Sequence, residues 1–259
     1  MSSVREAAPA EPAQSRFAGT LFDVLDKVRY ARIRPDDFDD PVYRLRYEAY
    51  RREDFLPPNP SGTYTDPLDH SDNAYCYGVF IEDRLVSSIR IHHITPQLRL
   101  SPSMTVYDDI LNPLLDQGLT FIDPTRFTAD HEASLAYPAL PYLTLRVALM
   151  ASEHFEVDYC LSSVRPEHAP FYRRVFRCAE MGPERGYNGL TFPIVMLATP
   201  VPTALPRVLE RYPFFRSTSD EREKLFGQGR LRFGEPITAT ARLAQNLRYR
   251  LEGEESVPA

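Results

Sequence analysis

The segment FIDPTRFTAD, residues 121–130, has the composition of a β-strand but an uneven arrangement of charge. Phe, Ile and Thr favour extended backbone, yet Asp123 and Arg126 lie three residues apart with Pro124 between them. Side chains alternate between the two faces of a regular strand, so this spacing would place the two charges on opposite faces. Proline cannot donate a ladder hydrogen bond and occurs at bulges, and a bulge reverses the alternation after it. We therefore predict a bulge at or near Pro124 that turns both charges to one side, with an irregular strand as far as Phe127.

Strands and helices are expected to alternate on both sides of this segment. Hydrophobic alternation and short apolar runs predict strands over residues 27–34, 74–82, 85–94, 121–130, 157–164 and 190–199. Helical periodicity and end signals predict helices over residues 35–54, 106–118, 139–155 and 167–182. The last helix is expected to end at Gly182 and Pro183, and residues 131–138 are expected to form a loop.

Composition divides the chain into three parts. Residues 1–18 are rich in Ala, Pro and Glu and are expected to be a disordered tail, whereas residues 19–200 form the main domain. Residues 201–259 are expected to be a basic helical C-terminal extension with a flexible end. Between 201 and 250 the extension carries ten basic and five acidic side chains. Its simplest interpretation is a solvated helical extension.

Charge and motif content limit the partners and the compartment. The formal net charge is −6, so we expect no nucleic acid as a partner. The three cysteines and six histidines have no metal-binding spacing, so we expect no metal. Neither a P-loop, nor G-x-G-x-x-G, nor a G-x-S-x-G elbow occurs. The chain opens without a signal peptide and has no apolar run near the ~18 residues of a membrane span, so a cytoplasmic protein without a transmembrane segment is expected.

A long loop, FLPPNPSGTYTDPLDHSDN at residues 55–73, carries two acidic residues at a spacing of three, Asp66 and Asp69. Loops longer than ~12 residues inside a compact domain are usually functional. Aspartate followed by proline is also typical of turns, so helix capping is an alternative to a role in a site.

Tyr172 and His168 lie near the start of the helix expected after the strand at 157–164. A tyrosine there can donate a proton to a departing thiolate. The alternative is an aromatic ring that packs against the sheet with its hydroxyl satisfied. The same helix carries three further cations, Arg173, Arg174 and Arg177.

Several of these residues fall into an ordered set of motifs. The set is LRYEAY with Arg46, the D-x-x-D of Asp66 and Asp69, SSIRI with Arg90, and the D-x-x-R-F of Asp123, Arg126 and Phe127. Across about residues 28–200 their order resembles the autoinducer-synthase-like branch of the GNAT fold. That branch comprises acyl-homoserine-lactone synthases and, more closely, N-acyl amino acid synthases of the FeeM type. The resemblance implies an α+β fold with a central, twisted, mostly antiparallel mixed sheet flanked by helices.

The resemblance also implies the reaction. Enzymes of this kind, which are bacterial, move a fatty acyl group from the phosphopantetheine thioester of an acyl carrier protein to an amine, and in FeeM-like enzymes the acceptor is an amino acid. Lactone synthases carry a tryptophan in the N-terminal loop and Glu at the position of Asp123, whereas this chain has no tryptophan. Both departures favour the amino-acid branch over S-adenosylmethionine as acceptor. No bound cofactor is expected.

The donor is expected to be a carrier protein, because HEASLAYPALPY, residues 131–142, stands where GNAT enzymes have a glycine-rich pyrophosphate loop. Without those glycines the backbone amides cannot form the usual anion-binding nest, so acyl-CoA is the less expected donor. Arg173, Arg174, Arg177 and the basic extension would meet the acidic carrier, and the extension is also expected to allow a weak contact with a membrane surface.

The resemblance suggests roles for the motif residues. Asp123 would accept the amine proton directly or through a water, and Asp130, His131 and Glu132 are alternatives. Backbone amides around Phe127 would hold the oxyanion.

The expected substrate contacts are the acceptor carboxylate and the acyl chain. Arg90 and Arg126 would bind the carboxylate, and His168 would lie beside the substrate. Alternatively, the arginines, with Arg46, form an internal ion-pair network with the aspartates that orders the loop. The acyl chain would lie against Leu143, Val147 and Met150. Two other functions stay open: a CoA-dependent N-acyltransferase and a non-catalytic protein of this fold that binds an acyl metabolite.

Overall fold

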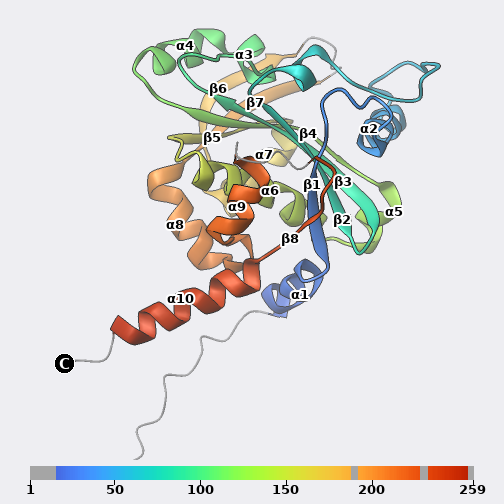
Figure 1. Cartoon of the computed structure of the whole chain (residues 1–259). Coiled ribbons are helices and arrows are strands. Elements are labelled where there is room, and N and C mark those ends of the chain that lie inside the picture. Colours follow the sequence, from blue (N-terminus) through green and yellow to red (C-terminus); the bar gives the residue numbers. More distant parts are fainter. Residues whose placement is uncertain (1–15, 188–191, 228–232, 256–259) are drawn as a thin grey trace, which may run out of the picture.

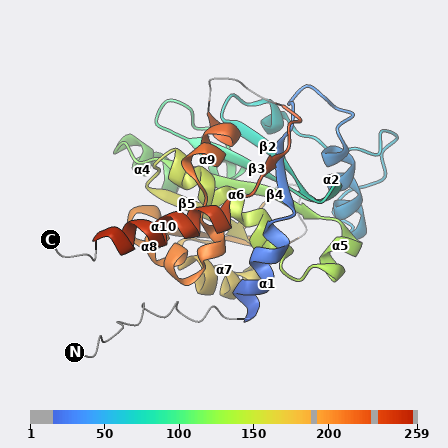
Figure 2. The same ribbon diagram turned by 60° about the horizontal axis from the view of Figure 1, so that its bottom comes forward.

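The computed structural model describes residues 16–187, 192–227 and 233–255 (Figures 1 and 2). The expected disordered tail at 1–18 and the flexible C-terminal end lie mostly outside these residues. Helix α1 (Arg16–Leu25) nevertheless begins inside the expected tail, and α10 (Ala241–Glu255) reaches the end of the described chain.

One eight-stranded sheet forms the centre of the molecule, in the order β6-β7-β5-β4-β3-β2-β1-β8. Its strands are β1 (Val28–Arg32), β2 (Ala74–Ile81), β3 (Arg84–Ile94), β4 (Phe121–Ala129), β5 (Tyr159–Val164), β6 (Ala179–Gly186), β7 (Pro193–Pro200) and β8 (Ile237–Thr238). Among these described strands, β4 and β5 are parallel and all other neighbours are antiparallel. The expected fold class, an α+β fold with a mostly antiparallel mixed sheet flanked by helices, is confirmed.

Helices cover both faces of the sheet (Figures 1 and 2). One face packs on a large apolar core beneath α6 (Leu140–His154), α7 (Ala169–Phe176), α8 (Val201–Arg211) and α9 (Ser219–Phe226). The other carries α2 (Pro41–Arg52), α3 (Pro102–Val106) and α4 (Asp108–Asp116). The remaining elements are α5 (His131–Ala136) and three 3-10 turns, η1 (Pro67–His70), η2 (Pro166–His168) and η3 (Pro213–Phe215).

β4 contains the predicted irregularity, slightly later than expected. Thr125 lies opposite Arg90 and Thr128 opposite Ser88, so Arg126 and Phe127 share a single partner position on β3. Two residues opposite one is a β-bulge, and Arg126 adopts the left-handed conformation with φ 52°. The irregular strand is therefore confirmed, whereas Pro124 itself keeps its register position and the bulge follows it.

The parallel pairing of β4 and β5 is very short. Only Phe121 with Tyr159 and Ile122 with Cys160 are in register, and the two strands separate beyond these pairs. After Ile122 no strand pairs with β4 on the side that faces β5. Pro124, which has no N–H, therefore leaves no hydrogen bond of the sheet unmade on that side.

The expected helix over 167–182 is wrong in its second half. α7 ends at Phe176, Arg177 takes the left-handed conformation with φ 57°, and β6 follows as an edge strand of the sheet. Gly182 does not stop a helix: a Cβ at this position would lie 2.8 Å from the Tyr107 ring, so glycine permits a close approach. The expected loop at 131–138 contains the short helix α5, and β8 was not expected.

The helices expected after residue 200 are present, but a solvated extension is wrong for residues 201–227. Phe214, Phe215 and Phe226 are buried in the core shared with α6, and β8 adds a strand to the sheet beside β1. Several basic side chains after residue 200 form ion pairs, namely Arg222 with Glu153, Lys224 with Asp220 and, in α10, Arg242 with Asp23 and Asp26. The expected membrane-surface contact stays a prediction. Within the described ranges, no helix is long and apolar enough to cross a bilayer.

Candidate functional site

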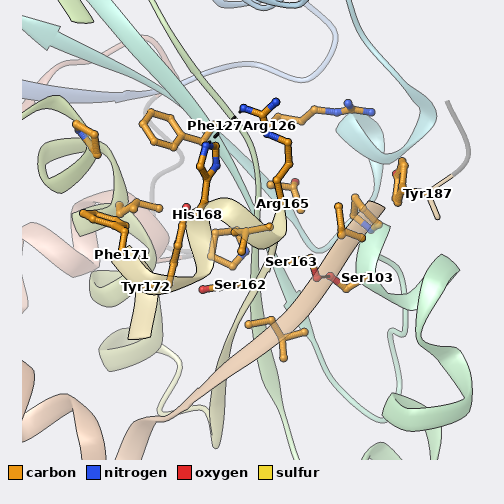
Figure 3. A pocket seen from close by; sticks show the side chains of 18 of the residues that line it. Ser103, Arg126, Phe127, Ser162, Ser163, Arg165, His168, Phe171, Tyr172 and Tyr187 are labelled. Atoms are coloured by element: carbon orange, nitrogen blue, oxygen red, sulfur yellow. Dashed lines mark hydrogen bonds between the residues drawn. The ribbon is translucent and has the colours of Figure 1, made fainter. Parts of the chain in front are cut away.

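A cavity of about 600 Å³ opens where β4 and β5 separate (Figure 3). β4 contributes Pro124–Phe127 and β5 contributes Leu161–Val164, while α3 adds Ser103 and α7 adds Phe171 and Tyr172. A mostly apolar cavity with a few polar groups has the size and character of a small-molecule site.

The cavity is lined from both faces of the sheet. Leu161 packs in the cluster beneath α3 and α4, whereas Cys160 packs in the core beneath α6. Because side chains alternate along β5, Ser163 lies on the α3 side and Ser162 on the α6 side. In Figure 3 Phe171 and Tyr172 lie across the cavity from Ser103 and Ser163. Two substrates can therefore meet in the gap from opposite faces.

Five of the predicted residues form one ion-pair network beside the cavity, which we call the arginine–aspartate network: Arg46, Arg90, Arg126, Asp66 and Asp69. Arg46 Nη1 donates to Asp69 at 2.7 Å, and Arg90 Nη1 lies 2.7 Å from Asp66 and 3.0 Å from Asp69. Arg126 donates to Asp66 Oδ2 through Nη2 at 2.5 Å and through Nε at 3.0 Å. The structure thus brings these five side chains together.

The network is buried and strongly coupled. Burial raises the pKa of the Asp66 carboxyl, but the charges and hydrogen bonds of Arg90 and Arg126 outweigh it and hold that pKa well below its usual range. The pKa of Asp69 is likewise lowered, because Arg46 and Arg90 outweigh its burial. Three arginines against two aspartates leave the network one positive charge in excess.

The network also organises the long loop. Asp66 caps η1 by accepting from Leu68 N, and the Asp69 side chain accepts from Asp66 N in return. Capping, which was one alternative for these aspartates, and the ion-pair network, which was one alternative for the arginines, are therefore both present, and a role of the aspartates in a site stays a prediction.

Arg126 is the member of the network that lines the cavity. Its guanidinium lies 4.9 Å from the centre of the Tyr64 ring and 5.5 Å from that of Tyr50, whose hydroxyl accepts from Nη1 at 3.3 Å. Arg90 is completely buried and does not line the cavity. Forked binding of a carboxylate by Arg90 and Arg126 is therefore not available in this arrangement, since Asp66 occupies the fork of Arg126.

Asp123 does not line the cavity, and the side chain of Ser103 lies between them. It is completely buried, and its carboxylate accepts from Ser103 Oγ at 2.9 Å and from Ser103 N at 3.1 Å. Burial raises the pKa of Asp123, and the hydrogen bonds of Ser101 and Ser103 and the charge of Arg90 offset this in part. Ser103 and Ser163, which do line the cavity, were missed from the sequence because only the packing of α3 against β4 and β5 joins them to Asp123.

The alternatives to Asp123 have other partners. Asp130 caps α5 and pairs with Arg84, and Glu132 pairs with the same arginine. None of Asp130, His131 and Glu132 lines the cavity. No group of three or more His, Cys, Asp and Glu side chains in the described part of the chain is arranged to hold a metal ion.

Tyr172, Phe127 and His168 all line the cavity. The Tyr172 ring packs against Phe171 and Phe176, and burial raises the pKa of its hydroxyl, which stays protonated at neutral pH. His168 is exposed, with Nε2 3.5 Å from Arg165 Nη2.

The residues of α6 that line the cavity are not the ones expected to contact the acyl chain. Leu143, Val147 and Met150 are buried in the core, and α6 lines the cavity through Pro141 and Leu145.

Comparison with solved structures supports the fold. FeeM, an N-acyl amino acid synthase from uncultured soil microbes, is 18% identical with a TM-score of 0.56, covering 71% of this chain and 96% of that chain. TofI, in a ternary complex with an inhibitor and MTA, is 13% identical with a TM-score of 0.52, covering 73% and 100%. BjaI, a CoA-dependent acyl-homoserine lactone synthase with MTA, is 12% identical with a TM-score of 0.51, covering 71% and 89%.

Comparison with protein families identifies the chain more closely. No curated protein matches it. The family model described as N-acyl amino acid synthase FeeM matches residues 41–200, more than half of the chain and all of the cavity-lining strands β4, β5 and β7. The chain therefore belongs to the FeeM family of N-acyl amino acid synthases and is an N-acyltransferase.

Proposed function

We propose that this enzyme transfers a fatty acyl group from the phosphopantetheine thioester of an acyl carrier protein to the amine of an amino acid or a related small amine. The observation that carries the proposal is the cavity between β4 and β5, which is lined from both faces of the sheet. A buried carboxylate lies behind its α3 side and a protonated tyrosine on its α7 side. We place the reaction in the cytoplasm, as expected from the sequence.

The residues around the cavity supply the two proton transfers that the reaction needs. The neutral amine attacks the thioester carbonyl, so a C–N bond forms and the C–S bond breaks. One amine proton passes to Asp123, and the departing thiolate takes a proton from Tyr172. Exchange with solvent returns both side chains to their starting states. The raised pKa of Asp123 makes its carboxylate a stronger proton acceptor, and the raised pKa of Tyr172 keeps its hydroxyl in the protonated form that a donor needs.

The charge of the site favours an acceptor that carries a carboxylate. The arginine–aspartate network holds one positive charge in excess, which the ionised Asp123 near Arg90 balances, and the cation that the network presents at the cavity is Arg126. A carboxylate on the α3 side would gain from this field without displacing Asp66 from Arg126. An amino acid, with an amine next to a carboxylate, meets both requirements.

Two features favour a carrier protein as the donor. The segment that opens α6 contains α5 and no glycine, so it offers no nest for a pyrophosphate. Arg174, on α7, and Arg177, which directly follows this helix, are exposed and make no ion pair with a described residue, whereas Arg173 pairs with Glu180. An acidic carrier would be attracted to these free cations in a salt-dependent way. A CoA donor is the second candidate, because BjaI, of similar fold, is described as CoA-dependent.

The test is a reconstituted reaction. Purified protein receives a mixture of amino acids and one acyl chain, supplied either on carrier protein or on CoA, and mass spectrometry detects N-acyl amino acids. We expect product from the carrier thioester at concentrations where acyl-CoA gives little. Product from acyl-CoA alone would overturn the proposal that a carrier protein is the donor. Acyl binding without any product would favour the non-catalytic alternative.

Charge reversal tests the docking surface. The variant Arg174→Glu/Arg177→Glu should raise KM for the acyl carrier at least about tenfold at low salt, and the difference should shrink as salt increases. The matched control is Arg44→Glu/Arg52→Glu, which makes the same change of charge with exposed residues of α2 on the other face of the sheet. Equal effects of the two variants would exclude a local surface on α7.

A further inference from the structure

Asp123 cannot touch a substrate in the cavity. Its side chain has no exposed surface, and the nearest groups that line the cavity on that side are the hydroxyls of Ser103 and Ser163. A proton from the amine must therefore cross other atoms to reach the carboxylate.

Ser103 and Ser163 lie next to each other in Figure 3, and hydrogen bonds join them to each other and to Asp123 in a continuous chain that starts at the cavity. Ser163 Oγ, on β5, lies 2.8 Å from Ser103 Oγ, on α3, and Ser103 Oγ lies 2.9 Å from Asp123 Oδ1. A second hydrogen bond, from Ser103 N to Asp123 Oδ2 at 3.1 Å, fixes the carboxylate against α3. These distances are those of ordinary O–H···O and N–H···O hydrogen bonds.

The chemistry of the three groups decides which atom donates in each of these hydrogen bonds. An ionised carboxylate only accepts hydrogen bonds, so the single hydroxyl proton of Ser103 must point to Asp123. Ser103 can then only accept from Ser163, whose own proton is used in that bond. Ser163 therefore presents its free lone pairs to the cavity and can accept an N–H from a bound amine.

We propose that Ser163 is a catalytic residue, and that a Ser163–Ser103 relay carries the amine proton to Asp123. The inference rests on the proposed function. As the C–N bond forms, the amine proton moves to Ser163 Oγ, the Ser163 proton moves to Ser103 Oγ, and the Ser103 proton moves to Asp123 Oδ1. One proton is lost from the amine and one is gained by the carboxylate, so both hydroxyls are unchanged in protonation.

The arrangement explains why the base is buried. The relay keeps Asp123 away from water and from the substrate carboxylate, which would otherwise repel it and compete for the positive charge of the arginine–aspartate network. Burial also raises the pKa of Asp123, so the carboxyl holds the transferred proton more firmly.

Replacement of Ser163 tests the relay. In Ser163→Ala the kcat should fall roughly 100-fold, within the usual range for the loss of a general base, while KM for the acyl donor stays within about threefold. Ser163→Thr keeps a hydroxyl and should recover at least a tenth of the wild-type kcat. Ser163→Cys places a weakly hydrogen-bonding sulfur at the same position and serves as the second variant if the alanine protein does not fold.

The pH profile separates a relay from a structural role. Below the pKa of the amine, log kcat/KM for the acceptor should fall with a slope of one, and below the pKa of Asp123 the slope should steepen to two. Ser163→Ala, in which Asp123 is disconnected, should keep a slope of one throughout. A folded Ser163→Ala or Ser163→Cys protein with full kcat and the steepened limb overturns the relay alone. Absence of any N-acyl product from the wild-type enzyme overturns the relay and the proposed function together.

Discussion

Glu221→Ala should destabilise the whole protein, because it breaks the buried ion pair that joins the segment after residue 200 to α6. Arg146 donates to Glu221 at 2.5 Å and 2.8 Å, and neither side chain is exposed. Arg146 also donates to the Arg216 carbonyl at 2.6 Å, and Glu221 Oε2 accepts from Thr240 N at 3.0 Å. The substitution leaves a buried guanidinium without its counterion and the Thr240 donors without an acceptor.

The expected loss follows from the burial. Removing one partner of a buried ion pair costs about 3–5 kcal/mol. In a protein of this size each kcal/mol lowers Tm by roughly 2–4 °C, so the expected decrease is roughly 6–20 °C. Thermal and urea unfolding followed by circular dichroism measure it. The surface control is Asp220→Ala, which removes the exposed i,i+4 partner of Lys224 and should change stability by about 0.5 kcal/mol or less.

A double substitution identifies the cause of the loss. Arg146→Met/Glu221→Leu removes both charges at similar volume, and apolar replacement of a buried pair is often neutral or stabilising. It should therefore recover the part of the stability lost in Glu221→Ala that comes from the unpaired guanidinium, whereas the Thr240 donors stay without an acceptor. A Glu221→Ala protein within 2 °C of the wild-type Tm would refute the view that this pair fastens the segment to α6, and a double variant no better than the single one would refute the buried charge as the cause.

Three further predictions concern the site and the sheet beside it. Tyr172→Phe should lower kcat roughly 100-fold with little change in KM for the acceptor, since it removes only the proton for the thiolate; steady-state kinetics with an unchanged kcat would exclude this role. Burial and the charge of Arg90 lower the pKa of His92 to about 3, so below the unfolded value of about 6.5 only the unfolded state gains a proton, and this residue alone should cost about 2 kcal/mol of stability between pH 7 and pH 5. Urea titrations at the two pH values measure the loss, and His92→Asn should reduce it by that amount, leaving the share of His93 and His154, whose pKa values burial also lowers. Asp66→Asn should cost about 3 kcal/mol in the same assay, because Arg90 and Arg126 lose a shared buried counterion, and a loss below 1 kcal/mol would contradict that pairing.

The sequence predicted those features of the fold that depend on local pattern. Alternation of apolar residues identified the central strands, and the proline with two charges in FIDPTRFTAD predicted an irregular β4. The sequence could not locate the bulge. Pro124 keeps its register position opposite β3 because no strand pairs with the β5 side of β4 at this point, so its missing N–H breaks no hydrogen bond. That absence results from the separation of two strands more than thirty residues apart in the chain.

The errors arise where tertiary contacts outweigh local preference. Residues 177–182 continue a helical pattern, yet β7 provides an open edge that pairs with β6, and Gly182 fits closely against Tyr107. The buried position of Asp123 was not predictable for the same reason. Its partners Ser103 and Ser163 are brought by α3 and β5, and nothing in the sequence near Asp123 indicates either of them.

The bulge connects the contacts that order the loop with the position of Arg126 at the cavity. A non-glycine residue in the left-handed conformation costs about 1–3 kcal/mol and persists only where its surroundings hold it. Arg126 is held by two hydrogen bonds to Asp66 and by the rings of Tyr50 and Tyr64. Asp66 is fixed in turn by Arg90 and by the turn that it caps. The network thus stabilises the strained backbone that turns Arg126 toward the cavity, on the same face of the sheet as Asp123. The same contacts order the loop and position Arg126 at the cavity.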